Sequence, residues 1–175
     1  MIGGGTPSTQ NPEYWDGEIN WYAPAEIGES IYVKSSKRRI TKLGLEKSSA
    51  KLLPIGTVLF TSRAGIGNTA ILKIEGTTNQ GFQSIVPIFG KLDSYFIYSR
   101  TKELKHYAEK VGAGSTFVEV SRKQMTEAPL LFPQISEQQS IGSFFSTLDY
   151  LITLQQRKLD LLNMQKQTLL KLMFY

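Results

Sequence analysis

The residues best suited to chemistry in this sequence are ones that bind polyanions. Between Ile31 and Lys51 the chain carries seven basic residues against Glu46 alone, a local charge of +6, whereas the whole chain carries +5. Such a concentration attracts nucleic acid before other partners. A solvated, lysine-rich loop fits the charge equally well. The residues expected to contact phosphates are Lys34, Lys37, Arg38, Arg39 and Lys42, and an arginine among them could also bond both acceptors of a guanine.

A second set of polar side chains lies in or beside predicted turns between strands. Side-chain amides there could bond adenine edges, and hydroxyls in a glycine-rich loop could hold phosphate. The set consists of Arg63, Asn68, Asn79, Gln80, Gln83, Ser115 and Thr116. The alternative role for each amide or hydroxyl is to stabilise a turn, and we prefer it for Asn79, Gln80, Ser115 and Thr116. The aromatic residues Trp15, Trp21, Phe82 and Phe117 are expected in the core.

Matches to catalytic motifs are incomplete. Gly65–Ala70 fits G-x-G-x-x-A, but the residues that follow favour a strand, and dinucleotide binding needs a helix there. Asn11–Tyr14 resembles the asparagine-proline-proline-aromatic motif of adenine methyltransferases but lacks the second proline. His106 is the single histidine, expected on an exposed or partly exposed helix side, and the chain has no cysteine. We therefore expect no enzymatic activity, no metal and no cofactor.

Alternating apolar and β-branched residues predict an α+β body. We expect strands at 19–23, 31–33, 57–62, 69–74 and 84–89, with 57–62 and 69–74 forming a hairpin. The basic segment is expected to be mostly loop. A helix is expected over 92–110, with Leu92, Phe96, Ile97, Leu104 and Tyr107 on its buried face, and one or two helical turns over 121–127. Residues 128–133 are expected to be extended.

The final stretch, 136–175, predicts one long helix that starts at a capping box of Ser136 and Gln139. It would be roughly 55 Å long. Residues in steps of four and three form a coiled-coil seam with two polar members. This seam consists of Leu148, Ile152, Gln155, Leu159, Leu162, Lys166, Leu169 and Met173. It requires a partner: another helix of the chain, a second copy or another protein. The alternative is a helix folded back on its own body.

Six short motifs in order carry a resemblance to a known family. They are Gly3–Ser8, Asn11–Trp15, Phe60–Ala64 with Ile66-Gly67, Thr78–Phe82, Gly114–Phe117 and Pro133–Gln138. The chain resembles the DNA specificity (S) subunit of type I restriction-modification systems, and in particular one target recognition domain followed by one conserved spacer helix. The chain differs from the usual pattern of this family in two ways. It lacks the short strand-forming segment before the triple glycine, and it lacks a second recognition domain and a second helix. These differences fit either a half-length subunit or a fragment.

The resemblance implies a compact mixed target recognition domain over 1–133 and a coiled-coil spacer helix over 134–175. It implies a non-catalytic subunit that reads a bipartite target in double-stranded DNA. Separately, the sequence has no run of about 18 apolar residues and no signal peptide, so we expect no membrane span and a cytoplasmic location. Methyltransferase (M) subunits would methylate adenine, a restriction (R) subunit could join for cleavage, and a single half would pair its helix with a second copy. The rival hypothesis is a protein-protein adaptor that uses the helix without sequence-specific DNA binding. A methyltransferase fragment is the rival enzyme hypothesis.

Overall fold

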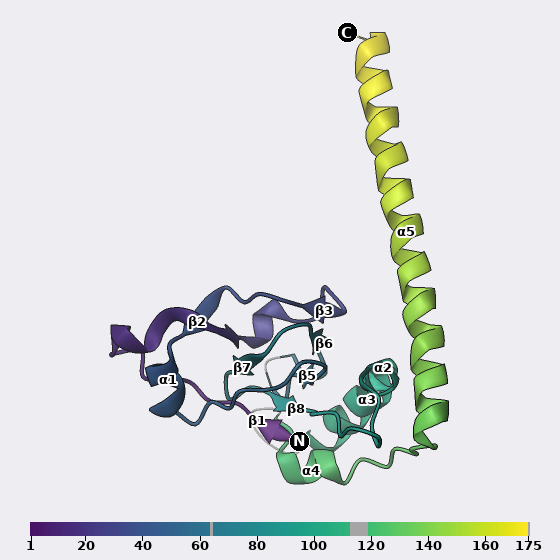
Figure 1. Ribbon diagram of the computed structural model, residues 1–175. Helices are drawn as coiled ribbons and strands as arrows, with labels where there is room; N and C mark the ends of the chain where they lie inside the picture. The colour runs from purple at the N-terminus through teal and green to yellow at the C-terminus, as the bar shows by residue number, and fades with distance from the viewer. Residues whose placement is uncertain (64, 113–118, 175) are drawn as a thin grey trace.

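The computed structural model describes residues 1–63, 65–112 and 119–174, and consists of a mixed body and one long projecting helix (Figure 1). The α+β fold expected from the sequence is confirmed. The strands are β1 Ile2–Gly3, β2 Trp15–Tyr22, β3 Tyr32–Val33, β4 Arg38–Ile40, β5 Val58–Phe60, β6 Thr69–Leu72, β7 Gly76–Thr78 and β8 Gln83–Ser84. The helices are α1 Lys42–Glu46, α2 Ser94–Ser99, α3 Thr101–Gly112, α4 Arg122–Thr126 and α5 Ile135–Phe174, with 3₁₀ turns η1 Pro12–Tyr14 and η2 Pro24–Glu26.

Among the described residues, three small sheets make up the β part of the body. One has the strand order β4-β2-β7, in which β2 is antiparallel to β4 and parallel to β7. A second has the order β3-β6-β5, and its antiparallel pair β5–β6 is the predicted hairpin. The third pairs β1 with β8. Isolated bridges, such as Thr61 with Phe82, connect the sheets into one body.

The core residues explain why these short strands are stable. One cluster packs Val58 and Phe60 of β5 against helices α2 and α3 through Tyr95 and Leu104. A second gathers around Tyr22, Leu59 and Phe82, and a third around Trp15 and Trp21. Trp15, Trp21 and Phe82 are buried, as predicted. Phe117 lies outside the described residues.

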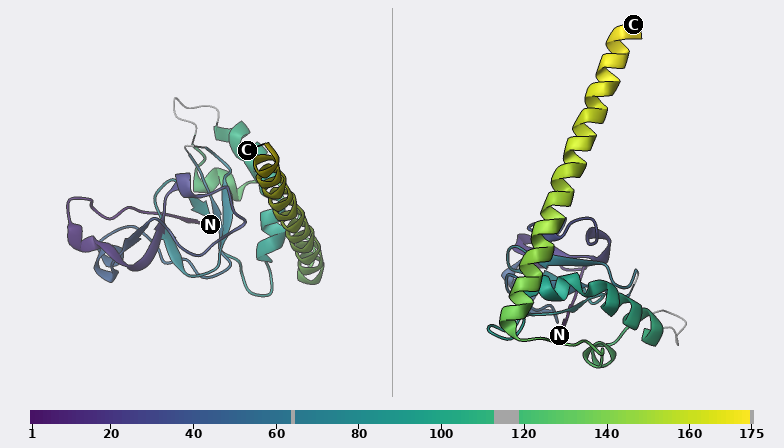
Figure 2. Two further views of the ribbon diagram at one scale, coloured as in Figure 1. Left: turned by 90° about the horizontal axis from the view of Figure 1, so that it is seen from above. Right: turned by 90° about the vertical axis from the view of Figure 1, so that its right-hand side faces the viewer.

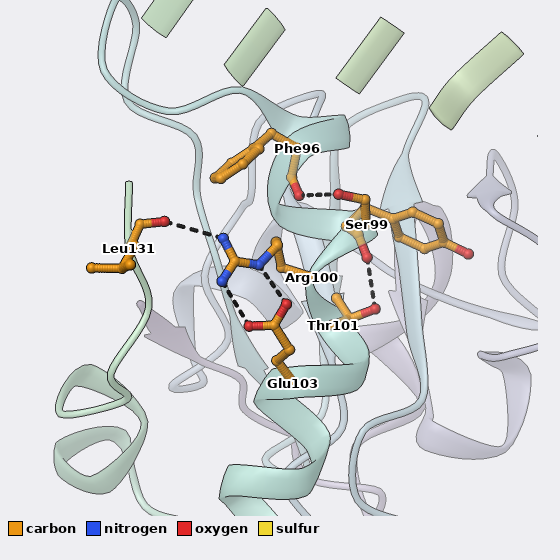
Figure 3. Close-up of polar contacts among 7 residues, drawn as sticks. Phe96, Ser99, Arg100, Thr101, Glu103 and Leu131 are labelled. Carbon is orange, nitrogen blue, oxygen red and sulfur yellow. Dashed lines mark hydrogen bonds and ion pairs between the residues drawn. The ribbon is translucent and has the colours of Figure 1, made fainter. Parts of the chain in front are cut away.

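The expected helix over 92–110 is instead two helices, α2 and α3, joined at Arg100. Asp93 caps α2 by accepting a hydrogen bond from the Phe96 amide at 2.8 Å. Figure 3 shows that Arg100 binds both carboxylate oxygens of Glu103 at 2.6 Å and donates to the Leu131 carbonyl at 3.1 Å. This ion pair raises the pKa of Arg100 and lowers that of Glu103. Arg100 thus ties the segment 128–133 to the helices. Phe96, Ile97 and Leu104 are buried as expected, while Leu92 and Tyr107 are only partly buried.

The long helix α5 begins at Ile135, so Ser136 lies inside its first turn and the predicted capping box is wrong. The first intrahelical bonds run from the amides of Glu137 and Gln138 to the Gln134 carbonyl. The buried Gln138 side chain anchors this end: it accepts from the Asp93 amide at 3.1 Å and donates to the carbonyls of Lys91 and Pro133. The left view of Figure 2 shows α5 along one side of the body, and the right view shows that it extends well beyond the body.

Whether the other predictions of secondary structure are right depends on the tertiary contacts that each segment makes. The predicted strand over 84–89 is wrong beyond Ile85. Gln83 and Ser84 pair with β1, and Ile85 forms an antiparallel bridge with Val58 of β5, but the residues after Ile85 pair with no strand in the described part of the chain. The basic segment is more ordered than expected, since it contains β4 and α1 in addition to β3. The helical turn over 121–127 is confirmed as α4. Residues 128–133 form neither helix nor strand, and a bond of 2.8 Å from the Leu130 amide to the Ala128 carbonyl makes a tight turn at Pro129, so the segment is not extended throughout.

Candidate functional site

The basic segment presents its arginines from a strand. Arg38 and Arg39 lie in β4, where they pair with Trp21 and Asn20 of β2, and both are exposed. The Arg38 guanidinium lies 3.6 Å from the centroid of the Trp15 ring and 5.8 Å from that of Trp21. Stacking on an aromatic face restrains the guanidinium and stabilises it by about 0.5–1 kcal/mol at an exposed site. Arg38 is therefore held ready for a planar ligand or a phosphate.

The tryptophans beneath Arg38 are held in turn by backbone carbonyls of the N-terminal segment. Trp15 and Trp21 meet edge to face, with centroids 5.2 Å apart. The Trp21 indole N–H donates to the Gly5 carbonyl at 2.9 Å, and that of Trp15 to the Ser8 carbonyl at 3.1 Å. The platform under Arg38 is thus rigid.

The other basic candidates surround this strand. Lys34 and Lys37 are exposed on the approach to β4, and Lys42 is the first residue of α1. The exposed carboxylates of Asp16 and Glu18 lie on the bulge of β2. The positive electrostatic potential at this sheet is therefore weaker than the charge of the basic segment alone suggests.

The second predicted set lies at the end of β7 and beside it. Asn79 accepts a hydrogen bond from the Gly81 amide at 2.8 Å through its side chain, which is the turn-stabilising geometry that the sequence favoured. Gln80 accepts from the Thr6 hydroxyl. Gln83 lies in β8 rather than in a turn, and among the described residues its buried Oε1 has no hydrogen-bond partner. Asn68 and Arg63 lie in the β5–β6 connection, half-buried. Ser115 and Thr116 lie outside the described residues.

The 3₁₀ turn η2 connects the two sets. Glu26 accepts hydrogen bonds from the backbone amides of Ala23 at 2.9 Å and Lys37 at 2.6 Å. At the other side of η2, Pro24 lies against Gly81, next to Arg63. The basic strand and the β7 turn are therefore parts of one framework.

The sequence motifs that carried the resemblance meet in space. The Gly5 amide donates to the Thr78 carbonyl at 2.8 Å, and the Ser62 amide donates to the Gly81 carbonyl at 2.8 Å. Gly4 lies so close to Thr78 and Asn79 that any Cβ would collide with their carbonyl oxygens. Three motifs far apart in sequence thus form one junction, which indicates a framework role for most of their residues.

The predicted seam of α5 is uncovered. Its apolar members Leu148, Ile152, Leu159, Leu162, Leu169 and Met173 are 41–74% exposed, and Gln155 and Lys166 are exposed as well. Every residue from 151 to 174 is exposed. The alternative in which the helix folds back on its own body is therefore wrong.

A second apolar stripe on α5 escaped the sequence analysis. Phe144, Leu151, Leu154, Leu161 and Leu172 are also exposed and flank the seam on one side. Their spacing of mostly seven and three residues was the available signal. Together the two stripes are wider than one partner helix covers.

The motifs rejected as catalytic have other roles in the structure. Residues 65–67 lead into strand β6 rather than a helix. His106 is exposed on α3. Within the described part of the chain, no three His, Cys, Asp or Glu side chains form a group that could hold a metal ion. Among the same residues, no helix is both long enough and apolar enough to cross a bilayer.

Comparison with known proteins agrees with the motif pattern. Residues 1–164 match the family described as type I restriction modification DNA specificity domain. The chain is 38% identical over 165 residues to the type I restriction enzyme MjaIX specificity subunit of Methanocaldococcus jannaschii, covering 93% of this chain and 38% of that protein. It is 31% identical over 157 residues to the EcoR124I/EcoR124II specificity subunit of Escherichia coli, covering 85% of this chain and 38% of that one. The chain thus spans under two fifths of these relatives' length.

Solved structures agree in fold. A chain from a study of complex assembly and conformational transition of the type I R-M system matches with a TM-score of 0.65 at 18% identity, over 89% of this chain and 37% of that one. The HsdS subunit from Thermoanaerobacter tengcongensis matches with a TM-score of 0.56 at 16% identity, over 89% and 36%. On the sequence matches, this chain belongs to the family of type I restriction modification DNA specificity domains.

Proposed function

We propose that this chain is a sequence-specific DNA recognition subunit that reads one half of a bipartite target within a type I restriction-modification system. The observation that carries the proposal is the uncovered seam of α5. This helix is attached to a body that has a basic strand, β4, on its surface. A reader of a two-part target needs a rigid element that holds two bodies apart, and a helix that extends beyond its body provides one.

DNA contacts in this proposal begin at β4. Arg39, Lys34, Lys37 and Lys42 bind phosphates, and Arg38, held on Trp15, reads a base edge or binds a phosphate. Arg63, Asn68 and Gln83 are the further candidates for base contacts, with Asn79 and Gln80 shaping the turn beside them. Family membership supports DNA as the ligand, since the matching family is a DNA specificity domain.

The assembly follows from the two stripes of α5. The seam binds the helix of a second specificity subunit. The flanking stripe, centred on Leu154 and Leu161, remains free to bind helices of M subunits, which supply adenine methylation. An R subunit can join the complex for cleavage. The chain itself is non-catalytic. We divide it into a target recognition domain, 1–133, and a spacer helix, 134–175. For the location of the complex we propose the cytoplasm.

The decisive experiment is methylome sequencing of cells with and without the gene. Loss of methylation at one two-part adenine motif supports the proposal. An unchanged methylome, in cells whose M subunits are active, contradicts it and favours the adaptor hypothesis.

Self-association through the seam has its own test. The variant with Leu159→Glu and Leu162→Glu should be monomeric in sedimentation equilibrium because carboxylates would oppose apolar partners. The matched control, Met164→Glu with Gln167→Glu, adds the same charge on the opposite side of the helix and should remain associated. A monomeric unmodified chain at high concentration would contradict pairing with a second copy.

A further inference from the structure

The guanidinium of Arg38 lies flat on an aromatic ring and keeps its donors available. Its central carbon is 3.6 Å from the centroid of the Trp15 ring, which is the separation of two flat groups in van der Waals contact. Stacking of this kind occupies the face of the guanidinium and leaves the N–H groups at its edge free to donate. Both ion pairs in the described part of the chain lie on or beside α3, so no carboxylate among those residues occupies the N–H groups of Arg38.

The two arginines of β4 point to opposite faces of their sheet. Arg38 pairs with Trp21 and Arg39 pairs with Asn20 across the antiparallel ladder of β2 and β4, and successive side chains of a strand alternate between faces. The ring contacts place Arg38 on the face of the tryptophans, so Arg39 lies on the other face, beside Asn20. The two neighbouring arginines therefore make different contacts with a ligand.

The bulge of β2 presents carboxylates beside the ring on which Arg38 lies. The register of β2 against β4 shifts between Trp15 and Ile19, and within this bulge Asp16 has a φ of 59°, a left-handed conformation that few residues other than glycine adopt. Bulges re-aim side chains and often lie next to functional sites. Asp16 and Glu18 are exposed, and their negative charges oppose the approach of a phosphate. The edge of a base carries no net charge, so this end of the sheet suits a base better than the DNA backbone.

We infer that Arg38 reads a guanine in the major groove by donating two hydrogen bonds, one to O6 and one to N7. This rests on the proposed function, and adds the base and the groove that one residue recognises. In the major groove guanine presents two acceptors, whereas adenine presents one acceptor and one donor, cytosine a donor, and thymine one acceptor and a methyl group. A guanidinium has donors only, so guanine is the base that satisfies two of its N–H groups.

The position of β4 in its sheet fits the major groove. In the order β4-β2-β7, β4 is the edge strand, and with β2 it forms an antiparallel ribbon. The major groove is about 12 Å wide and admits a two-stranded ribbon, whereas the undistorted minor groove, about 6 Å wide, is too narrow for one. The exposed Lys37 precedes β4 and the exposed Lys42 follows it, so cations for phosphates lie on either side of Arg38 along the chain. Figure 1 shows β2 on the side of the body away from α5, so the long helix leaves this ribbon open to DNA.

The rings under Arg38 make the contact selective. Trp15 and Trp21 are both buried, and each indole N–H is bonded to a backbone carbonyl, at 3.1 Å and 2.9 Å. A side chain that is held in place before binding loses less conformational freedom on binding and is less able to turn to another acceptor when the base is wrong. We expect discrimination against the other three bases of about 5- to 150-fold, the range for a bidentate pair.

The composition of the DNA target is the first test. Methylome sequencing of cells that carry the gene gives the two-part motif, and the half-site that this body reads should contain at least one G·C pair. A motif without a G·C pair in either half would overturn the assignment of Arg38 to guanine. The proposed function would still stand in that case, since it fails only if the methylome is the same with and without the gene.

Base analogues test the contact in the purified complex of the full chain with its M subunits. Each guanine of the target is replaced in turn by 7-deazaguanine, which lacks the N7 acceptor, or by hypoxanthine, which keeps O6 and N7 and lacks only the amino group that guanine presents in the minor groove. We expect one guanine at which 7-deazaguanine weakens binding about fivefold or more, the effect of one lost hydrogen bond, while hypoxanthine changes it little.

The unmodified chain alone can contradict this expectation, so the test does not depend on the folding of a variant. Weaker binding with hypoxanthine but not with 7-deazaguanine would indicate a contact in the minor groove. Unchanged binding with 7-deazaguanine at every guanine would show that no N7 atom is read. Either result overturns the assignment.

Two matched variants of neighbouring residues then identify Arg38 as the reader. Arg38→Gln should bind the natural target about 5- to 150-fold more weakly and should lose nothing further when 7-deazaguanine is present. Arg39→Gln removes the same charge from the next residue. It should weaken binding to the natural and the substituted target by the same factor, and it should reduce the slope of log K against log salt by about 0.9, as expected for a phosphate contact. If Arg38→Gln keeps the sensitivity of the unmodified chain to 7-deazaguanine, or if it behaves as Arg39→Gln does, Arg38 does not read a guanine.

Discussion

The hydroxyl of Tyr95 in α2 donates a 2.8 Å hydrogen bond to the carboxylate of Asp149 in α5. Together with Gln138 and Gly142, this contact sets the direction in which the long helix leaves the body. Tyr95 is buried and packs against Tyr98 and Tyr32, so its position is fixed from the body side. If α5 sets the distance between two DNA recognition domains, this hydrogen bond determines how precisely each domain is oriented.

Replacing Tyr95 with Phe should therefore loosen the helix without unfolding the body. We expect the free energy of unfolding to fall by about 1–2 kcal/mol, the range for a hydrogen bond to a charged group that retains some access to water. Spin-label distances between the body and Ser143 should broaden. Tyr150→Phe, an exposed tyrosine next to Asp149, is the control and should change neither quantity.

The same bond predicts a loss of stability in alkali. Burial, and then the hydrogen bond and negative charge of Asp149, raise the pKa of Tyr95 above its ordinary value of 10.0. A raised pKa favours the protonated phenol in the folded state, so its contribution is fully present below pH 10 and is lost as pH rises toward the folded pKa. Burial also raises the pKa of Tyr22 to about 12, so the contribution of Tyr22 to stability is lost in the same direction.

The difference between the wild type and Tyr95→Phe isolates the effect of Tyr95. Chemical denaturation at pH 8 and pH 11 should show a smaller gap between the two proteins at the higher pH. An equal gap at both values would contradict a role for the protonated phenol.

Gly142 should tolerate no side chain although it lies inside a helix. A Cβ there would lie 2.5 Å from Oδ1 of Asp93 and 3.0 Å from the amide nitrogen of Phe96, which are the two partners of the α2 cap. Gly142→Ala would gain about 1 kcal/mol in helix propensity but separate α5 from α2 and disturb a cap of about the same value.

We expect Gly142→Ala to lower the melting temperature. The control is Ser143→Ala, which improves propensity at the next position, where the side chain is exposed. If Gly142→Ala is as stable as Ser143→Ala, close packing of α5 on α2 is not required.

Neutralising the arginines of β4 should weaken DNA binding by the assembled complex. Replacing Arg38 and Arg39 with Gln should lower affinity and reduce the slope of log K against log salt by about two if both contact phosphates, since each contact contributes about 0.9. If Arg38 reads a base, the slope should fall by about one and discrimination at one base pair should relax by about 1–3 kcal/mol.

The matched control for this pair is Lys102→Gln with Lys110→Gln. These exposed lysines lie on α3, which is away from β2 (Figure 1), the strand that pairs with β4. Their loss removes the same charge from the body and should leave the slope nearly unchanged. Equal effects of the two variants would indicate a response to net charge and would count against β4 as the contact surface.

The sequence by itself determined the features that depend on local or periodic patterns. The steps of four and three from Leu148 to Met173 predicted the long helix and its seam, because helix geometry alone places those residues on one face. Alternating β-branched residues predicted the β5–β6 hairpin for the same kind of reason. The ordered motifs identified the family, since their order is a property of the chain and needs no coordinates.

Only the tertiary structure decided what depends on contacts between distant segments. The break at Arg100 exists because Asp93 caps α2 and Arg100 binds Glu103 and the Leu131 carbonyl. The strand β4 forms because β2 offers it an edge, and the placement of Arg38 on Trp15 follows from that pairing. The helix starts at Ile135 rather than at a capping box because Gln138 binds residues 91 and 93 of the body. Periodicity fixes which residues of a helix share a face, but whether that face is covered depends on where the rest of the chain folds.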